Sequence, residues 1–381
     1  MELSNRVLEN LEERRMNLIN GKINSIPSPF KRFREDFIGF EQGTYYGITS
    51  FTKGGKTQFT LNLLFEALLF AHSHYDIMKF KVFYFVLEET PERIMQRFMS
   101  WLLFRLDNIR ISPKDLRSSQ NDRPVPKEIL DKLQSDIYSE YIEFFEQCFT
   151  FSTTANPTGI YLECKKYAEN NGKVYKKQVD FNNSDIFDYY IPNDPFEYRI
   201  IVIDHISLID SEKGMSKKEA IDKLSEYLAK YLRNRYNFIP IVIQQQSAET
   251  ESNDSFKLGR IRPSGAGLSD SKYVARDVNV LMGLFSPFKF GLKEYMGYDI
   301  TKFKDSIRFL EMCVNRDGEL GGIVALYFDG ATCTFKELPP PDDKASLEQI
   351  YSYINSTKYK KDKLFFIYNI FNKFKQLTKQ K

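Results

Sequence analysis

The sequence predicts an α/β fold in which helices flank a mostly parallel central sheet. From residue 45 onward, short apolar runs typical of strands alternate with longer segments whose apolar residues recur at helical spacing. Several of the short runs end in polar residues, and parallel sheets bind their ligands at the carboxyl ends of the strands. These observations predict a layered core with a ligand site along one edge of its sheet.

The elements follow in order along the chain. Core strands are expected at 45–49, 81–87, 149–152, 199–204 and 239–244. The most regular helices are expected at 57–72, 91–106, 158–170 and 217–236. After an apolar run at 278–284, hairpin-like sequence at 307–315 and 321–328 contains Asp-Gly turn signals. These last segments are expected to form a closing β-hairpin.

Three parts of the chain are distinguished by composition. Residues 1–20 predict a short amphipathic linker or oligomerisation helix, which Gly21 ends. Residues 21–338 are the expected core domain, with aperiodic polar segments at 107–135 and 171–198 interpreted as surface excursions. Residues 339–381 begin with three prolines and predict a Lys-rich helical tail. The tail is expected by default to pack on its own core, with a partner protein or DNA as alternatives.

Composition favours a globular protein. Hydrophobic residues make up 42% of 381 residues, yet no apolar stretch reaches the length of a membrane span. The polar N-terminus lacks the apolar core of a signal peptide, so we expect no membrane partner and a cytoplasmic location, in a bacterial or phage-infected cell. The four cysteines lie far apart, which excludes a zinc motif and a disulfide framework.

Charge is uneven along the chain. The net charge is +3, but residues 356–381 carry eight Lys against one Asp, which leaves −4 for residues 1–355. Contacts between the main body and nucleic acid must therefore come from local basic loops.

Residues 50–57 read SFTKGGKT, one Gly short of the phosphate-binding pattern GxxxxGK[ST], because Ser50 replaces the first Gly. In such a loop, backbone N–H groups converge on phosphates, a Lys reaches the terminal phosphates and a Thr hydroxyl takes Mg²⁺. Lys56 and Thr57 are expected in these two roles. A Gly-Gly turn before an ordinary helix is the alternative. The expected nucleotide-binding set is Ser50, Lys53, Gly54, Gly55, Lys56, Thr57 and Gln58.

Three other strands would bring polar side chains to the same edge. Asp204, Glu88 and Gln245 each stand at or just beyond the end of an apolar run. In nucleoside triphosphate hydrolysis an Asp holds the Mg²⁺ shell, a Glu activates the attacking water and a Gln senses the γ-phosphate, and we assign the three residues in that order. His205 is expected to make local contacts and to bind no metal. The set predicts ATP hydrolysis with Mg²⁺.

The order of these motifs resembles the DnaB-like replicative DNA helicases, a family of hexameric RecA-fold proteins, over residues 21–335. The likeness rests on SFTKGGKT, VLEETPERIMQRFM, RIIVIDHISLID, IPIVIQQQS and FLEMCVNRDGELGGIVALYFD. It implies a RecA-like core corresponding to the C-terminal ATPase domain, ATP bound between subunits, a homo-oligomeric, hexameric ring, and single-stranded DNA threaded through it. A loader or another replisome protein is a further implied partner.

The resemblance also implies residues that act between subunits and on DNA. Arg316 matches the family's finger Arg, which reaches the neighbour's γ-phosphate, whereas Val314 stands where the family has a Lys. Two DNA-binding loops correspond to 210–218 and 248–273. The basic residues of the second loop are Lys257, Arg260 and Arg262, which nearby acidic residues offset. An ordinary solvated loop would read similarly. The family's primase-docking domain is expected to be missing, since only residues 1–20 precede the core.

Three functions compete. The leading hypothesis is a ring-forming, ATP-driven DNA helicase acting in replication. The second is a RecA-like DNA-dependent ATPase acting in recombination, loading or defence without processive unwinding, which Val314 favours. The third is an assembly protein that binds ATP only to oligomerise. Glu88 argues against the third, because binding alone needs no water-activating carboxylate.

Overall fold

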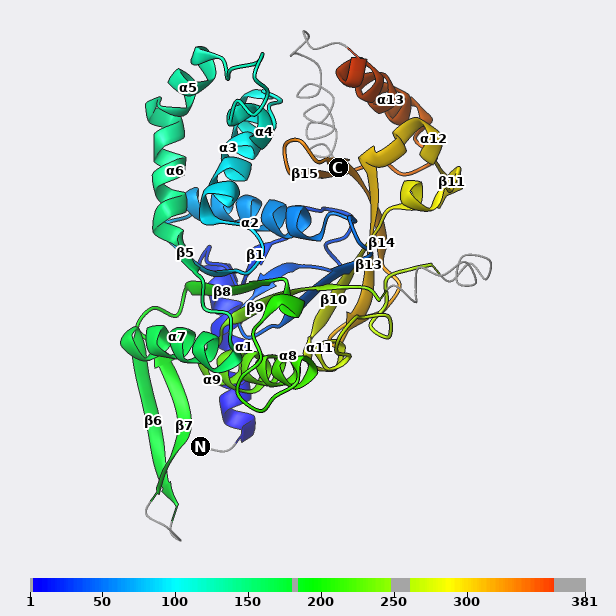
Figure 1. The fold of residues 1–381 in the computed structure, drawn as a ribbon. Coiled ribbons are helices and arrows are strands. Elements are labelled where there is room, and N and C mark those ends of the chain that lie inside the picture. Colours follow the sequence, from blue (N-terminus) through cyan, green and yellow to red (C-terminus); the bar gives the residue numbers. More distant parts are fainter. Residues whose placement is uncertain (1–2, 180–183, 248–260, 360–381) are drawn as a thin grey trace.

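The computed structural model describes residues 3–179, 184–247 and 261–359. A nine-stranded sheet lies at the centre of this part of the chain, in the order β15-β14-β13-β10-β3-β9-β8-β4-β5 (Figure 1). The parallel strands are β10 (Val280–Phe285), β3 (Tyr46–Ser50), β9 (Ile239–Gln245), β8 (Glu197–Asp204), β4 (Lys79–Val86) and β5 (Phe149–Ser152). The antiparallel strands β13 (Ile307–Asn315), β14 (Ile323–Asp329) and β15 (Thr334–Glu337) extend one end. The expected mostly parallel central sheet is confirmed.

Helices cover both faces of the sheet, so the parallel strands are buried on both sides and read as continuous apolar runs. Along β8, Ile200 and Val202 belong to the apolar cluster on one face, and Ile201 and Ile203 to the cluster on the other. The first face carries α2 (Lys56–His72), α3 (Pro91–Asp107) and α6 (Asp136–Cys148). The second carries α7 (Pro157–Asn170), α8 (Lys217–Glu226) and α11 (Tyr273–Asp277).

The helix expected at 217–236 has three parts. Ser216 and Glu219 form a capping box at the start of α8. The chain then continues as a π-helix (Tyr227–Arg233) and the short α9 (Asn234–Tyr236), which Asn237 ends with a φ of 55°. The helical periodicity of this segment did not indicate the π-helix.

A third apolar cluster lies at the antiparallel end of the sheet. It includes residues of α12 (Ile300–Phe303) and of α13 (Lys344–Tyr359), such as Leu347, Ile350 and Ile354. The described part of the C-terminal tail therefore packs on the core of its own chain. Residues 360–381 lie outside the described residues.

The two segments interpreted as excursions contain regular structure that sequence analysis did not expect. Residues 107–135 include α4 (Pro113–Leu116) and α5 (Lys127–Leu133). Residues 171–198 include an antiparallel hairpin of β6 (Gly172–Val179) and β7 (Ser184–Pro192), which projects from the body in Figure 1. The hairpin was missed because a two-stranded ribbon outside the main sheet pairs Lys with Phe or Ile, which weakens its hydrophobic alternation.

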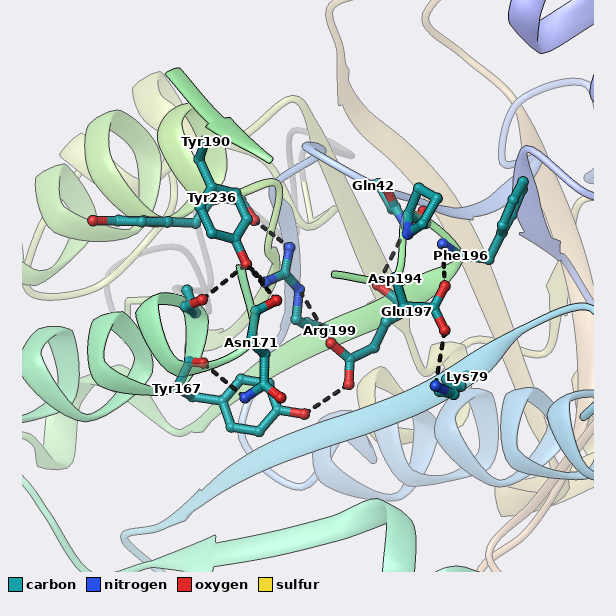
Figure 2. A network of polar contacts seen from close by, with 12 residues as sticks. Gln42, Lys79, Tyr167, Asn171, Tyr190, Asp194, Phe196, Glu197, Arg199 and Tyr236 are labelled. Carbon is teal, nitrogen blue, oxygen red and sulfur yellow. Dashed lines mark hydrogen bonds and ion pairs between the residues drawn. The ribbon is translucent and has the colours of Figure 1, made fainter. Parts of the chain in front are cut away.

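A buried arginine holds the base of this hairpin (Figure 2). Arg199 on β8 is 2% exposed and donates to the Tyr190 hydroxyl on β7 (3.0 Å) and to the carbonyl oxygen of Tyr236 (2.7 Å). Tyr190 in turn donates to the carbonyl oxygen of Ala168 on α7 (2.9 Å). A guanidinium with several fixed acceptors is held rigidly, so these contacts anchor the hairpin to the body.

The other described elements are short, apart from the N-terminal helix. They are α1 (Leu3–Ile19), β1 (Ser25–Pro27), β2 (Gly39–Glu41), β11 (Glu294–Tyr295) and β12 (Tyr298–Asp299). Among the described residues, no helix has the length and apolarity needed to cross a membrane. All four cysteines are free thiols, and burial raises the pKa of the Cys148 thiol to about 12.

Candidate nucleotide-binding site

The loop between β3 and α2 makes a tight turn. Lys53 and Gly55 adopt positive φ angles of 59° and 99°, and the Gly54 N–H donates to the carbonyl oxygen of Phe51 over 3.0 Å. A Cβ atom on Gly54 would lie 2.4 Å from the Ser50 Oγ, so only Gly fits there. Ser50 is buried and its hydroxyl donates to the Phe51 carbonyl oxygen over 2.8 Å. The residue that departs from the phosphate-binding pattern therefore closes the turn.

The loop is also held from outside. Arg308 on β13 is almost fully buried and donates from Nε to the Gly54 carbonyl oxygen over 2.9 Å. Lys289 donates to the carbonyl oxygen of Thr52 over 3.1 Å. These carbonyl groups are thereby engaged away from the start of α2, whose N-terminal N–H groups and helix dipole favour anions. Sequence analysis missed Arg308, because nothing in its local pattern reveals a contact with a loop some 250 residues away.

Asp204 lies at the C-terminal end of β8 and meets the start of α2. Thr57 Oγ1 donates to Asp204 Oδ1 over 3.1 Å, and the Tyr84 hydroxyl donates to Oδ2 over 2.7 Å. Asp204 is only 3% exposed, and this burial raises the pKa of its carboxyl group to about 6. The predicted Mg²⁺ pair is thus brought together, and Tyr84 is a partner that sequence analysis did not identify.

The donor set fits Mg²⁺. Among the described residues no cluster of three or more His, Cys, Asp or Glu side chains could hold a metal alone. Mg²⁺ usually takes one or two protein oxygens and completes its shell with phosphates and water. Asp204 and Thr57 supply one carboxylate and one hydroxyl within hydrogen-bonding distance of each other, at the start of the expected phosphate-binding helix.

Two glutamates follow β4, and the structure separates their roles. Glu89 is paired with Arg97 of α3, whose Nε lies 2.7 Å from Oε2, so its charge is engaged. Glu88 is exposed, and its charge contributes to the raised pKa of Asp204 and opposes the lowering of the pKa of His205. Glu88 therefore faces the same edge as Asp204.

His205 lies beside this group and is partly buried. Burial lowers the pKa of its imidazole, which keeps the ring neutral at neutral pH. Its Nδ1 is buried without a hydrogen-bond partner among the described residues. The expectation that His205 would bond locally is not met at this atom.

The three glutamines at the end of β9 point in alternate directions, as a strand requires. Gln245 donates to the hydroxyl of Thr52 in the phosphate loop. Gln244 and Gln246 are buried and donate to carbonyl oxygens of residues 264–271, at 2.9 Å for Ser271 and 3.0 Å for Ser264. This strand therefore contacts both the phosphate loop and the described end of the second expected DNA-binding loop. Only Gln245 was identified from the sequence.

Arg316 lies at the opposite edge of the sheet. Its Nε donates to the Val278 carbonyl oxygen over 2.8 Å, and Nη2 donates to that of Arg276. The pairing of Val280 with Asn315 places it at the start of β10, whereas Ser50 pairs with Leu284 at the other end. At about 3.3 Å per residue the two edges are well separated. The structure brings Lys56, Thr57, Glu88, Asp204 and Gln245 to one edge and does not bring Arg316 to them.

The expected DNA-binding loops are only partly described. Residues 210–218 are held against α7 and α8, because Glu212 accepts from the backbone N–H of Thr158 (2.7 Å) and from Lys223. Lys257 and Arg260 lie outside the described residues. Arg262 is half exposed, and its Nη1 lies 3.8 Å from Glu311 Oε1 on β13.

Comparison with solved structures identifies the fold. The ATPase domain of one DnaB-like helicase, solved on its own, superposes with a TM-score of 0.61 at 15% identity, covering 89% of this chain and 99% of that one. A DnaB-like replicative helicase, solved together with its interactions with primase, superposes with a TM-score of 0.60 at 17% identity, covering 89% of this chain and 67% of that one. No protein-family model and no curated protein matches the sequence. The chain therefore has the RecA-like fold of DnaB-like helicase ATPase domains, as its motifs predict.

Proposed function

We propose that this chain is a DnaB-like, ATP-dependent DNA helicase that hydrolyses ATP at the subunit interfaces of a homo-oligomeric ring. It would move along single-stranded DNA and unwind duplex during replication, with a loader or another replisome protein as partner. The observation that carries the proposal is the contact between Thr57 and Asp204 beside a phosphate-binding loop, with Glu88 at the same edge. The likeness of the fold to helicase ATPase domains supports it.

Each residue has a task in this proposal. The N–H groups at the start of α2 and the Lys56 ammonium bind the phosphates, and Gly54 and Gly55 permit the close approach. Thr57 and Asp204 hold Mg²⁺, which when bound neutralises charge on the phosphates. Glu88 orients the attacking water and accepts its proton. Gln245, which contacts Thr52, relays the state of the γ-phosphate to β9 and the loop beyond it.

The test is ATP hydrolysis with and without single-stranded DNA. We expect the wild-type protein to be stimulated by the DNA, Lys56→Ala to lose nucleotide binding, and Glu88→Gln to bind ATP while losing turnover by roughly a hundredfold or more. Glu89→Gln is the matched control, because Glu89 is paired with Arg97. A wild-type protein that hydrolyses no ATP with DNA present would contradict the proposal.

A second candidate is a RecA-like DNA-dependent ATPase that does not unwind processively, acting in recombination, loading or defence. Two observations favour it: Val314 provides no second finger cation, and Arg262 is close to Glu311 in place of being free for DNA. Strand displacement on a forked duplex separates the two functions. Displacement supports the helicase, whereas DNA-stimulated hydrolysis without displacement supports the second candidate.

A further inference from the structure

A continuous aromatic surface covers the outer side of the π-helix. Tyr227 and Tyr231 both contact Tyr161 of α7, with ring centroids 4.7 and 5.7 Å from the Tyr161 centroid. The rings of Tyr227 and Tyr231 lie 5.7 Å apart, almost at right angles. Three tyrosines from two helices therefore form one patch.

Basic side chains extend this patch at both ends. Lys223 Nζ lies 5.5 Å from the Tyr227 ring centroid. The Arg235 guanidinium lies 4.5 Å from the ring of Tyr231 and 5.0 Å from that of Phe187 on the β6–β7 hairpin. The hairpin base is fixed by Arg199, so its ring is presented at a defined place (Figure 2). We name these six residues, Lys223, Tyr227, Tyr161, Tyr231, Arg235 and Phe187, the aromatic stripe.

The stripe is more than core packing. All six side chains are partly exposed, so each presents a surface to solvent. The same helix fills the core with other residues, because Leu224, Leu228 and Leu232 are fully buried. Partly exposed rings beside cations on a folded surface are typical of binding sites.

The backbone under the stripe is unusual. Tyr227 and Tyr231 belong to the π-helix, a conformation that is rare and is frequently found at functional sites. Neither the buried leucines nor the cap at Asn237 requires this wider turn, since an α-helix would accommodate both. The π-helix is therefore an independent indication of function at this place.

Charge favours an anionic ligand. Residues 217–236 contain six Lys or Arg against three Asp or Glu, within a main body whose net charge is −4. Lys223 is also paired with Glu212, so Arg235 is the principal cation of the stripe. Arg235 lies between two rings, whereas protein interfaces keep their charged groups mainly at the rim.

We propose that the aromatic stripe binds single-stranded nucleic acid outside the ATP site. Unpaired bases would stack on the tyrosine rings and Phe187, and phosphates would contact Arg235. Duplex DNA fits less well, because its bases already stack on one another. This inference deepens the proposed function, and it rests on that function for the choice of a nucleic acid as ligand.

The test measures the affinity of the full chain for a fluorescein-labelled oligothymidylate by anisotropy, without ATP. Combined Tyr231→Leu and Arg235→Glu should weaken binding roughly tenfold or more, and Tyr231→Phe combined with Arg235→Lys should stay within about threefold of wild type. Lys114→Glu, at an exposed Lys on α4, is the charge control. Circular dichroism and ATP hydrolysis without DNA confirm that each variant is folded.

A second readout locates the contact directly. An oligonucleotide carrying 5-iododeoxyuridine forms photoadducts with nearby aromatic residues, and we expect adducts on the peptides that hold Tyr161 or Tyr231. Wild-type binding that the double variant retains, with adducts only elsewhere, would overturn the stripe and leave the ATPase proposal intact. No binding by the wild-type protein would overturn both. If the variant loses oligomer assembly at unchanged oligonucleotide affinity, the stripe is a contact between subunits and the inference is wrong.

Discussion

Tyr84 donates its hydroxyl hydrogen to Oδ2 of Asp204 over 2.7 Å, while Thr57 occupies Oδ1. Both carboxylate oxygens of the buried Asp204 are therefore oriented by the chain itself. Tyr84 lies on β4, the strand next to β8, and is almost fully buried. A carboxylate fixed in this way is ready for a cation without rearrangement.

Removing the Tyr84 hydroxyl should therefore affect metal use more than folding. We expect Tyr84→Phe to lower the free energy of unfolding by about 1 kcal/mol. It should raise the Mg²⁺ concentration for half-maximal ATP hydrolysis roughly tenfold. Tyr138→Phe, which removes a hydroxyl bonded to Asp107 on the surface, is the control. An unchanged Mg²⁺ dependence in Tyr84→Phe would show that the hydroxyl does not position Asp204.

The phosphate loop gives a second prediction. Gly54→Ala places a methyl group 2.4 Å from Ser50 Oγ, so the loop must shift, and affinity for a fluorescent ATP analogue should fall roughly tenfold. Ser50→Gly removes the obstructing side chain and should restore most of the affinity in the double variant. Ser50→Gly alone is the control. If the double variant binds no better than Gly54→Ala, the side chain of Ser50 is not the cause of the loss.

The fold and the residues at strand ends could be predicted, whereas contacts between distant elements could not. Thr57, Glu88, Asp204 and Gln245 follow apolar runs, and parallel strands bring their ends to one edge. Tyr84 and Arg308 are single polar residues within apolar strands, and only the packed sheet shows what they contact.

The β6–β7 hairpin was missed for a different reason. Its strands pair with each other outside the main sheet, so their sequence lacks the continuous apolar run of a core strand. Its anchor, Arg199, is a charged residue at the start of a buried strand, where burial is exceptional and depends on acceptors supplied by other elements.

Glu212 gives a prediction for pH. Its hydrogen bonds with Lys223 and then Thr158 lower the pKa of Glu212 to about 2, below its unfolded value of about 4.3. A lowered pKa stabilises the fold above the unfolded pKa, and the contribution disappears as pH falls toward the folded pKa. Glu212→Gln should therefore lower the free energy of unfolding by about 1 kcal/mol at neutral pH, and by much less near pH 2.

Urea titrations at several pH values measure this difference. Glu226→Gln is the control, because Glu226 pairs with Lys230 one turn along the same exposed helix face. Its effect should be only a few tenths of a kcal/mol. An effect of Glu212→Gln that is equally large at neutral and acidic pH would contradict the assignment of the stabilisation to the ionised carboxylate.

The position of Arg316 leads to a prediction about subunit cooperation. Arg316 and the phosphate loop lie at opposite edges of the sheet, so in the proposed ring Arg316 would act on the ATP of a neighbour. Arg316→Ala should bind ATP normally and lose turnover, while Lys56→Ala should lose ATP binding. When the two inactive variants are mixed in equal amounts and allowed to assemble, about a quarter of the interfaces combine an intact Lys56 with an intact Arg316. ATP hydrolysis should therefore reappear on mixing, and it should not when Lys56→Ala is mixed with the double variant. Full activity of Arg316→Ala alone, or no recovery in the mixture, would place Arg316 outside the reaction.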